Sequence, residues 1–302
     1  MIPIGVSNTK TKKNPDIGKT HPCFSKEAHH TFGRIHLPVA PACNIQCKYC
    51  VRKYDCANES RPGITSKVMT PREAVERVLL LMERNDRITV IGIAGPGDPL
   101  ANDTTFEVLG AINREFPELT LCVSTNGLLL TDRLPELMKC GVKSLTITMN
   151  AVTPETAEKI YSWVSYRGKK YIGKEAAACL VANQTRGLRN AIDAGFMVKV
   201  NSVFIPGINN ADLPLVAWLA GMRGAEIMNV LPLIPQADFA DIKGPSRGMV
   251  DRMRAECTRY IPQMTHCRQC RADAFGVLGE DRDMELEALN ARIGEEYCEM
   301  VA

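Results

Sequence analysis

Short runs of β-branched and apolar residues alternate along this chain with longer segments whose apolar residues recur at helical spacing. Six runs are predicted to be strands: 34–39, 87–94, 119–124, 144–150, 197–204 and 226–231. Seven segments are predicted to be helices: 71–84, 104–116, 132–139, 154–163, 175–194, 211–222 and 245–260. This alternation predicts an α/β fold with a parallel sheet and right-handed crossovers. A partial (βα)6 TIM-like barrel fits best, although the pattern also allows a doubly wound sheet.

The length favours one main domain. A chain of 302 residues, 45% of them hydrophobic, is nearly filled by one α/β barrel of about 250 residues. Residues 1–20 show no periodicity and are expected to be a mobile tail. We place the barrel at 21–265 and a C-terminal extension at 266–302.

Charge and hydropathy argue against a nucleic acid or a membrane as partner and say little about other partners. The longest mainly apolar stretch, 88–94, is far shorter than the roughly 20 residues that cross a bilayer, and the N-terminus lacks an apolar signal core. The net charge is +3, with both signs interspersed. We therefore expect a soluble, cytoplasmic protein that binds neither nucleic acid nor a membrane.

Cysteine is the informative residue type. Twelve cysteines without a secretion signal indicate metal or redox chemistry rather than disulfides. Cys43, Cys47 and Cys50 form C-x3-C-x2-C just after the first predicted strand, and three thiolates leave one iron of a four-iron cube open. The amino and carboxylate groups of S-adenosylmethionine (SAM) can chelate that iron. A structural zinc site or a bacterial-type ferredoxin would want a different ligand pattern.

A second cysteine motif lies near the C-terminus. Cys267 and Cys270 form C-x2-C, which can hold one metal ion or one edge of a cluster. Cys56 supplies a third ligand if the C-terminal segment folds over the barrel mouth. A zinc ion that staples the C-terminal tail is the alternative.

Polar or glycine-rich elements follow the predicted strands. Residues 95–99 follow the second strand, 125–127 the third, and Asn150 ends the fourth. Because the carboxyl ends of parallel strands form the active-site face, these elements are expected to converge on one site.

The cysteine spacing, with Tyr49 before its last member, resembles the radical SAM superfamily, and residues 95–99 stand where that superfamily has its SAM-binding glycine loop. The fold expected from this resemblance is the superfamily's partial barrel, with terminal extensions that carry cluster ligands. The expected SAM contacts, each of which also suits a turn or a cap, are Tyr49, Gly95, Gly97, Asp98, Ser124, Asn126, Thr148 and Asn150.

Five segments together resemble the NifB family of radical SAM enzymes over about residues 21–279: they are 21–25, 43–50, 59–63, 94–101 and 266–273. The resemblance implies an enzyme that fuses two [4Fe-4S] clusters, K1 and K2, with a SAM-derived carbide and an extra sulfur. The product is the eight-iron precursor of the nitrogenase cofactor in nitrogen fixation. The chain is similar to the short methanogen-type form, which has no C-terminal carrier-like domain.

The resemblance also implies three ligand sets. They are Cys43, Cys47 and Cys50 for the SAM cluster, Cys56, Cys267 and Cys270 for K2, and Cys23, His36 and Cys122 for K1. A lone strand cysteine such as Cys122 is more often a core residue. However, His36 and Cys122 fall on the first and third predicted strands, whose inward side chains can face one cavity.

The implied chemistry uses two SAM molecules. A ferredoxin-like donor reduces the SAM cluster, one SAM gives its methyl group to a cluster sulfide, and a radical from the second SAM abstracts hydrogen from that methyl group. Glu59 and Arg61 would handle protons or steady the sulfides, or they simply form an ion pair that pins their loop. Further implied partners are an iron-sulfur cluster donor and a scaffold or carrier protein for the cofactor.

Two other functions stay open. One is a radical SAM enzyme with a single auxiliary cluster and a peptide or small-molecule substrate. The other is a non-enzymatic iron-sulfur carrier or electron-transfer protein. The remaining cysteines, in or beside predicted helices, are interpreted as structural, and they are Cys140, Cys179, Cys257 and Cys298. His29 and His30 are expected at the surface.

Overall fold

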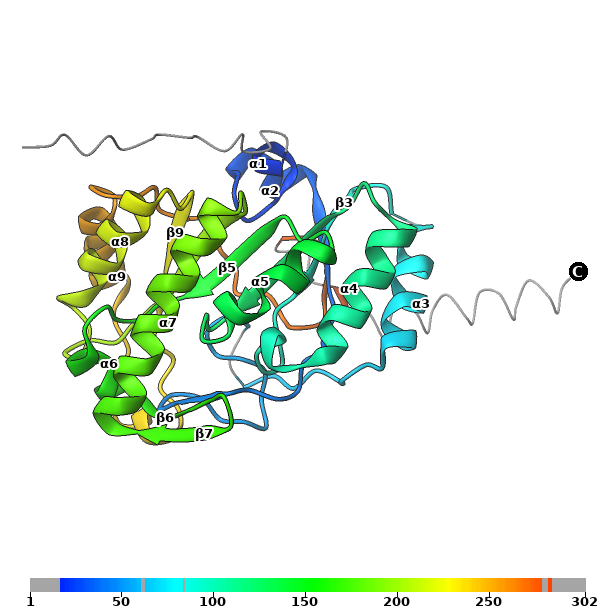
Figure 1. Ribbon diagram of the computed structural model, residues 1–302. Coiled ribbons are helices and arrows are strands. Elements are labelled where there is room, and N and C mark those ends of the chain that lie inside the picture. The colour runs from blue at the N-terminus through cyan, green and yellow to red at the C-terminus, as the bar shows by residue number, and fades with distance from the viewer. Residues whose placement is uncertain (1–16, 61–62, 84, 279–281, 284–302) are drawn as a thin grey trace, which may run out of the picture.

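The fold is a partial barrel of parallel strands with helices on its outside (Figure 1). The computed structural model describes residues 17–60, 63–83, 85–278 and 282–283. Its main sheet has the order β11-β10-β1-β3-β4-β5-β8-β9. The six neighbouring parallel strands are β1 (Gly33–His36), β3 (Ile88–Ile93), β4 (Thr120–Thr125), β5 (Ser144–Thr148), β8 (Met197–Phe204) and β9 (Ile227–Pro232). The predicted (βα)6 partial barrel is therefore confirmed, and the doubly wound alternative is wrong.

The long helices begin and end within three residues of their predicted bounds. They are α3 (Pro71–Met82), α4 (Asp103–Glu115), α5 (Leu130–Lys139), α7 (Gly173–Asp193), α8 (Asp212–Arg223) and α9 (Arg247–Cys257). At the start of α3, Thr70 and Glu73 form a reciprocal capping box. None of the helices in the described part of the chain is long and apolar enough to cross a membrane.

Side chains of the parallel strands alternate between two environments. Ile91, Val123 and Ile147 pack into the apolar core that the outer helices cover. The intervening Cys122 and Lys199 face the interior of the barrel, where they line a cavity. The interior is thus polar at positions that in a filled barrel carry branched apolar side chains.

One predicted helix ends early. Helix α6 covers Pro154–Ile160, and residues Tyr161–Tyr166 form strand β6 instead of continuing the helix predicted over 154–163. Aromatic and β-branched side chains favour the extended state there. Strand β6 pairs with β7 (Lys169–Ile172) and with β2 (Ile45–Cys47) in a small second sheet. This sheet supports the loop that carries the cysteine signature.

Both terminal segments pack onto the barrel. Strand β10 (Ala274–Val277) pairs antiparallel with β1 and with β11 (Arg282–Asp283). The buried guanidinium of Arg34 donates to the carbonyl oxygen of Gly276 at 2.8 Å. At the other end, Ile17–Thr20 form helix α1, so these four residues of the expected tail are helical, while residues 1–16 lie outside the described part.

The short helix α2 (Lys26–Thr31) corrects one surface prediction. His29 is buried, and its ring lies 5.1 Å from that of His266, because α2 packs against the returning C-terminal segment. His30 is exposed as expected. The short 3₁₀ helices cover Pro99–Ala101 and Ala237–Phe239.

We predict that Asp212→Ala lowers the free energy of unfolding by about 2–4 kcal/mol. The buried carboxylate of Asp212, the first residue of α8, accepts hydrogen bonds from Val152 N at 2.9 Å, Thr153 N at 3.0 Å and Thr156 Oγ1 at 2.9 Å. The substitution leaves these donors unpaired. Anaerobic urea denaturation measures the free energy of unfolding. An equal decrease in the control variant Asp241→Ala, at an exposed position, would contradict the prediction.

Candidate functional site

Two cavities lie inside the barrel, and they share part of one wall. Including the space that opens to solvent, the smaller has a volume of about 360 Å³ and the larger about 660 Å³. Glu59 and Ser124 line both cavities. Two adjoining chambers therefore lie inside the barrel, and residues 97–98 and 125–126 from the expected elements both line the smaller one.

The smaller cavity contains the three signature cysteines. Cys47 ends β2, and Cys50 N donates to the Cys47 carbonyl at 3.0 Å, so a tight turn holds these two residues beside Cys43. Burial raises the pKa of all three thiols. A buried thiol of this kind becomes a thiolate when a metal takes the place of the proton.

Amide groups point at two of these sulfurs. Asn126 Nδ2 lies 3.8 Å from Cys43 Sγ, and Asn58 Nδ2 lies 3.8 Å from Cys47 Sγ. Hydrogen bonds to sulfur stabilise thiolates and tune bound clusters. The three thiols and their amide donors therefore fit an iron-sulfur cluster with three protein ligands.

Arg52 adds a positive charge to this cavity, and the sequence reasoning missed it. Burial alone would lower the pKa of Arg52, but the neighbouring Cys43 thiol raises it above its ordinary value. Its guanidinium is held by Gln46 Oε1 at 3.0 Å and by the Ile45 carbonyl. The position two residues after the last signature cysteine is the only sequence cue for this role.

The glycine-rich loop packs tightly against the signature loop. Gly97 N donates to the Ala40 carbonyl at 2.5 Å, and a Cβ atom on Gly97 would collide with the carbonyl oxygen of Ala42. Only glycine fits there without displacing the backbone. Gly97 lines the smaller cavity, whereas Gly95 does not.

Asp98 ties this loop to the end of β4. Its carboxylate accepts hydrogen bonds from Thr125 Oγ1 at 2.9 Å, Asn126 N at 2.6 Å and Leu100 N at 3.0 Å. Burial raises the pKa of Asp98 to about 6, although these donors oppose the shift. Asp98 thus lines the smaller cavity and also holds the glycine-rich loop against the end of β4.

The other expected SAM contacts divide into two groups. Ser124, Asn126 and Thr148 line the smaller cavity. Tyr49 and Asn150 do not, because Asn150 Nδ2 donates to the buried Tyr49 hydroxyl at 2.6 Å and Asn150 Oδ1 accepts from Val203 N at 2.8 Å. In this structure, these two residues support the wall from behind.

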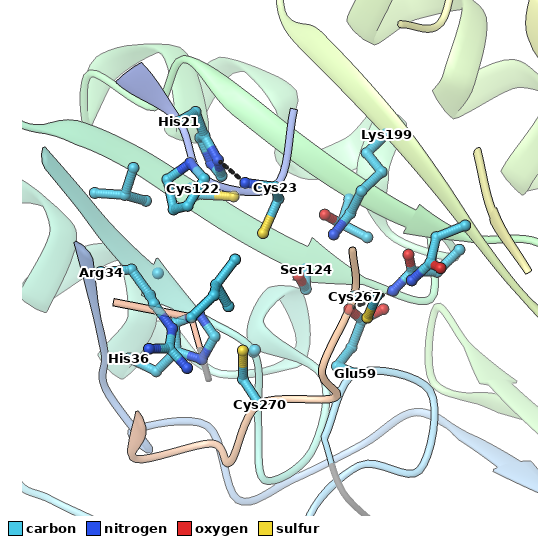
Figure 2. Close-up of a pocket in the computed structure, with 18 of the residues that line it drawn as sticks. His21, Cys23, Arg34, His36, Glu59, Cys122, Ser124, Lys199, Cys267 and Cys270 are labelled. Atoms are coloured by element: carbon cyan, nitrogen blue, oxygen red, sulfur yellow. Dashed lines mark hydrogen bonds between the residues drawn. The ribbon is translucent and has the colours of Figure 1, made fainter. Parts of the chain in front are cut away.

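The larger cavity gathers ligands from distant parts of the chain (Figure 2). Five cysteine and histidine side chains of the expected cluster sets line it: Cys23, His36, Cys122, Cys267 and Cys270. Burial raises the pKa of Cys122, and it raises that of Cys23 to about 12. His36 Nδ1 lies 3.1 Å from the Arg271 carbonyl, which favours a proton on Nδ1 and a lone pair on Nε2. The expected K1 set thus shares one cavity.

The expected K2 set is divided between the cavities. Cys56 lines the smaller one with the signature cysteines, while Cys267 and Cys270 line the larger one. Among the described residues, no three His, Cys, Asp or Glu side chains converge on the position of a single metal ion. The three expected K2 ligands therefore line two adjoining cavities that share Glu59 and Ser124.

Glu59 stands at the shared wall. Its carboxylate accepts hydrogen bonds from Thr148 Oγ1 at 2.8 Å and from Asn201 Nδ2 at 2.9 Å. Burial raises the pKa of Glu59 to about 7, against the opposing effect of Lys199. Glu59 can therefore exchange a proton near neutral pH. Arg61, its expected companion, lies outside the described residues.

Lys199 is a buried cation that the sequence reasoning also missed. It lies on β8 and points into the larger cavity (Figure 2). Burial alone would lower the pKa of Lys199, but Cys23 and Glu59 raise it above its ordinary value. Lys199 could have been identified from the sequence, because it is a lysine inside a strand that is predicted to be fully buried.

Comparisons with known proteins identify relatives of this chain. Residues 37–219 match the family model of the radical SAM superfamily. The FeMo cofactor biosynthesis protein NifB of Klebsiella pneumoniae is 46% identical over 283 residues, which cover 91% of this chain and 60% of that protein. The NifB of Chlorobaculum tepidum is 45% identical over 273 residues, which cover 89% of this chain and 64% of that protein. The chain thus spans less than two thirds of these curated relatives.

One solved structure supports the fold. The crystal structure of SuiB of Streptococcus suis bound to S-adenosylmethionine superposes with a TM-score of 0.54 at 11% identity. The match covers 77% of this chain and 50% of SuiB. It supports the partial-barrel fold alone.

We predict that Glu59→Gln changes the pH dependence of stability. Between the ordinary pKa of 4.5 and the folded pKa of about 7, the folded state keeps a proton that the unfolded state has lost, so Glu59 lowers wild-type stability as the pH rises. The variant lacks this loss. The free energy of unfolding of the variant minus that of the wild type therefore increases from pH 5 to pH 8.

Urea denaturation of the reduced, cluster-free protein at several pH values measures this difference. Glu118→Gln, at an exposed position, is the matched control and keeps the wild-type slope. Parallel curves for Glu59→Gln and the wild type would contradict the prediction.

Proposed function

The chain belongs to the radical SAM superfamily, and from this premise we propose that it cleaves SAM at a [4Fe-4S] cluster held by Cys43, Cys47 and Cys50. We further propose that it fuses two four-iron substrate clusters, K1 and K2, with a SAM-derived carbide and an extra sulfur. The product would be an eight-iron precursor of the nitrogenase cofactor. The observation that carries this proposal is the second cavity, lined by four cysteines and two histidines, which shares part of its wall with the cavity of the signature cysteines.

The smaller cavity supports the first half of the proposal. When bound there, a reduced cluster supplies the electron that cleaves SAM. The side chains of Asn58 and Asn126 donate to the cysteine sulfurs, and Arg52 offsets the negative charge of the thiolates. The protein thereby holds a thiolate set that burial alone would disfavour.

The strand ends beside this cluster suit a polar cofactor. Ser124, Asn126 and Thr148 offer hydroxyl and amide groups on the cavity wall, and Gly97 lets the glycine-rich loop pack against the backbone of Ala42 beside them. We assign SAM to this wall. Asp98 keeps the wall in place through its bonds to the β4 end.

The larger cavity supports the second half. We assign K1 to Cys23, His36 and Cys122, and an edge of K2 to Cys267 and Cys270. Cys56 would complete the K2 site at the boundary, because Glu59 and Ser124 lie on both cavities. An imidazole ligand such as His36 suits a cluster that must later leave the site.

We propose that Glu59 accepts protons during carbide formation. A methyl carbon that becomes carbide must lose all of its hydrogens, and not every one leaves through a radical. A carboxylate with a pKa of about 7 that faces both cavities is a suitable general base. Thr148 and Asn201 hold it in position.

The proposed reaction needs partners. A ferredoxin-like protein would supply electrons, a cluster donor would load K1 and K2, and a scaffold or carrier protein would receive the product. The relatives of this chain that carry the name FeMo cofactor biosynthesis protein support this assignment.

A second candidate function has one observation in its favour. The separation of Cys56 from Cys267 and Cys270 suits a radical SAM enzyme with a single auxiliary cluster in the larger cavity. Its substrate would be a peptide or another small molecule. Iron content separates the two candidates.

We predict that the anaerobically reconstituted protein, given dithionite and SAM, binds about twelve irons per chain and forms both 5'-deoxyadenosine and S-adenosylhomocysteine. The first nucleoside reports the radical step, and the second reports methyl transfer. Deoxyadenosine alone with about eight irons would support the single-cluster candidate. If neither nucleoside forms, both candidate functions are rejected.

We also predict that Cys47→Ala binds about four irons fewer and forms no deoxyadenosine, because it removes one of three ligands of the SAM cluster. Cys179→Ala is the matched control, since Cys179 lies in α7 and lines neither cavity. Iron analysis and chromatography of the nucleosides give the result. Unchanged iron in Cys47→Ala would contradict the ligand assignment.

A further inference from the structure

The small second sheet has an outward face that no step above uses. Gln46, Trp163 and Ile172 are register partners on β2, β6 and β7, so their side chains form one row across this face. Val164, the next residue on β6, lies on the opposite face and packs into an apolar core. Ile172 is 69% exposed, and Trp163 is partly exposed. The row therefore presents apolar surface to solvent, on the opposite side of the molecule from α1 (Figure 1).

This outward face lies against the signature cysteines. Cys47 is the last residue of β2, the strand that also carries Gln46. The Gln46 amide donates to the carbonyl oxygens of Cys47 and Cys50, at 2.9 Å each. Its Oε1 accepts from Arg52 Nε at 3.0 Å, and Arg52 is exposed at the surface while it also lines the smaller cavity. A single glutamine thus separates the outward face from two proposed ligands of the SAM cluster.

Positive charge is concentrated around the same face. Residues 45–54 contain three basic and no acidic side chains, and residues 161–174 contain four basic and no acidic ones, although the whole chain has a net charge of only +3. Arg167 is neutralised by Asp132 at 2.8 Å, and Glu175 is the first acidic residue after the second segment. The remaining excess forms a basic border beside the apolar row.

Three of these lysines lie over aromatic rings. Their ammonium groups are 4.6 to 4.9 Å from the ring centroids in the pairs Lys53 with Tyr54, Lys169 with Tyr171 and Lys170 with Trp163. Within the described part of the chain, none of the three forms an ion pair with a carboxylate. An aromatic ring attracts a cation without neutralising it, so the charge stays available to a partner.

The chemistry of the face selects one kind of partner. A second copy of the chain would bring like charges together, which disfavours pairing through this face. A negatively charged protein would complement the basic border, and Trp163 is the residue type that most often anchors a protein interface. A redox centre carried by such a protein would come close to the cysteines that hold the SAM cluster.

We propose that this face, with Trp163 and Ile172 at its centre and Lys170 beside them, docks an acidic electron-transfer protein that reduces the SAM cluster. The inference rests on the proposed function, which needs one electron for each SAM that is cleaved to a radical. In each transfer the donor is oxidised by one electron and the SAM cluster is reduced by one.

The docking face is tested with a reduced, acidic bacterial-type ferredoxin as the donor and deoxyadenosine formation as the readout. At low ionic strength, Lys170→Glu is expected to lower kcat/KM for the ferredoxin about tenfold, and added salt is expected to shrink this deficit. Dithionite is a small reductant that needs no docking face, so with dithionite the variant and the wild type are expected to react at equal rates. Equal kcat/KM values for the ferredoxin would overturn the proposal.

The matched control is Lys143→Glu, which makes the same change of charge at an exposed lysine just before β5. This residue lies at the amino end of the parallel strands, away from the signature loop, and the variant is expected to keep the wild-type kcat/KM. A tenfold loss in Lys143→Glu as well would show a general effect of net charge and would overturn the docking face.

Cross-linking locates the contact independently of turnover. A carbodiimide joins lysines to carboxylates that touch them, and mass spectrometry identifies the joined residues in the reconstituted protein with the ferredoxin. We expect cross-links from Lys169 and Lys170, and none from Lys143. Cross-links confined to lysines outside residues 45–54 and 161–174 would overturn the proposal.

Further outcomes assign the face to another partner and reject the proposal. One is an oligonucleotide that displaces the ferredoxin from the wild type but does not bind Lys170→Glu. Another is a dimer of the wild type, seen in sedimentation, that dissociates in Ile172→Glu.

The two reductants separate this inference from the function on which it rests. Wild-type protein that forms deoxyadenosine with dithionite, but neither accepts electrons from the ferredoxin nor cross-links to it, rejects the docking face alone. Wild-type protein that forms no deoxyadenosine with either reductant rejects the proposed function, while cross-links at Lys169 and Lys170 would still support the docking face.

Discussion

The period-two alternation of the parallel strands is the constraint on which the molecule depends. Residues such as Ile91 and Val200 face the helices and bury apolar surface, which stabilises the barrel by roughly 25 cal/mol for each Å² removed from water. Their neighbours Gly92 and Lys199 must then face the interior. A shift of one residue in any strand would exchange these two sets, so the register that builds the core also places the site.

The same constraint explains why His36 can face the cavity. Gly92 lies beside His36 in the register between β1 and β3, and a Cβ on Gly92 would stand 2.8 Å from the imidazole Cδ2. Glycine at this point weakens a strand, but it leaves space for the ring. Cys122 on β4 is the register partner of Gly92. Across three neighbouring strands, the order is therefore an imidazole, a glycine without a side chain and a thiol.

The sequence predicted the strands well because each is a short apolar run between turn signals. It did not predict β6, whose aromatic residues follow a helical start without a glycine or proline between them. Cys56 shows a second limit of prediction from sequence. A sequence motif does not indicate which of two adjoining cavities its side chain lines. Lys199 was also missed, since its importance comes from neighbours that are distant in the sequence.

The buried interior also couples cluster binding to protonation. Burial raises the pKa of thiols such as Cys43 and Cys122, so these groups keep their protons in the metal-free protein, and the proposed loading of clusters would release them. Arg52 and Lys199, one in each cavity, would stabilise the thiolates that form. Because Glu59 lies on both cavities and has a pKa of about 7, a change of charge in either one alters its protonation, and the chemistry of the two chambers is electrostatically linked.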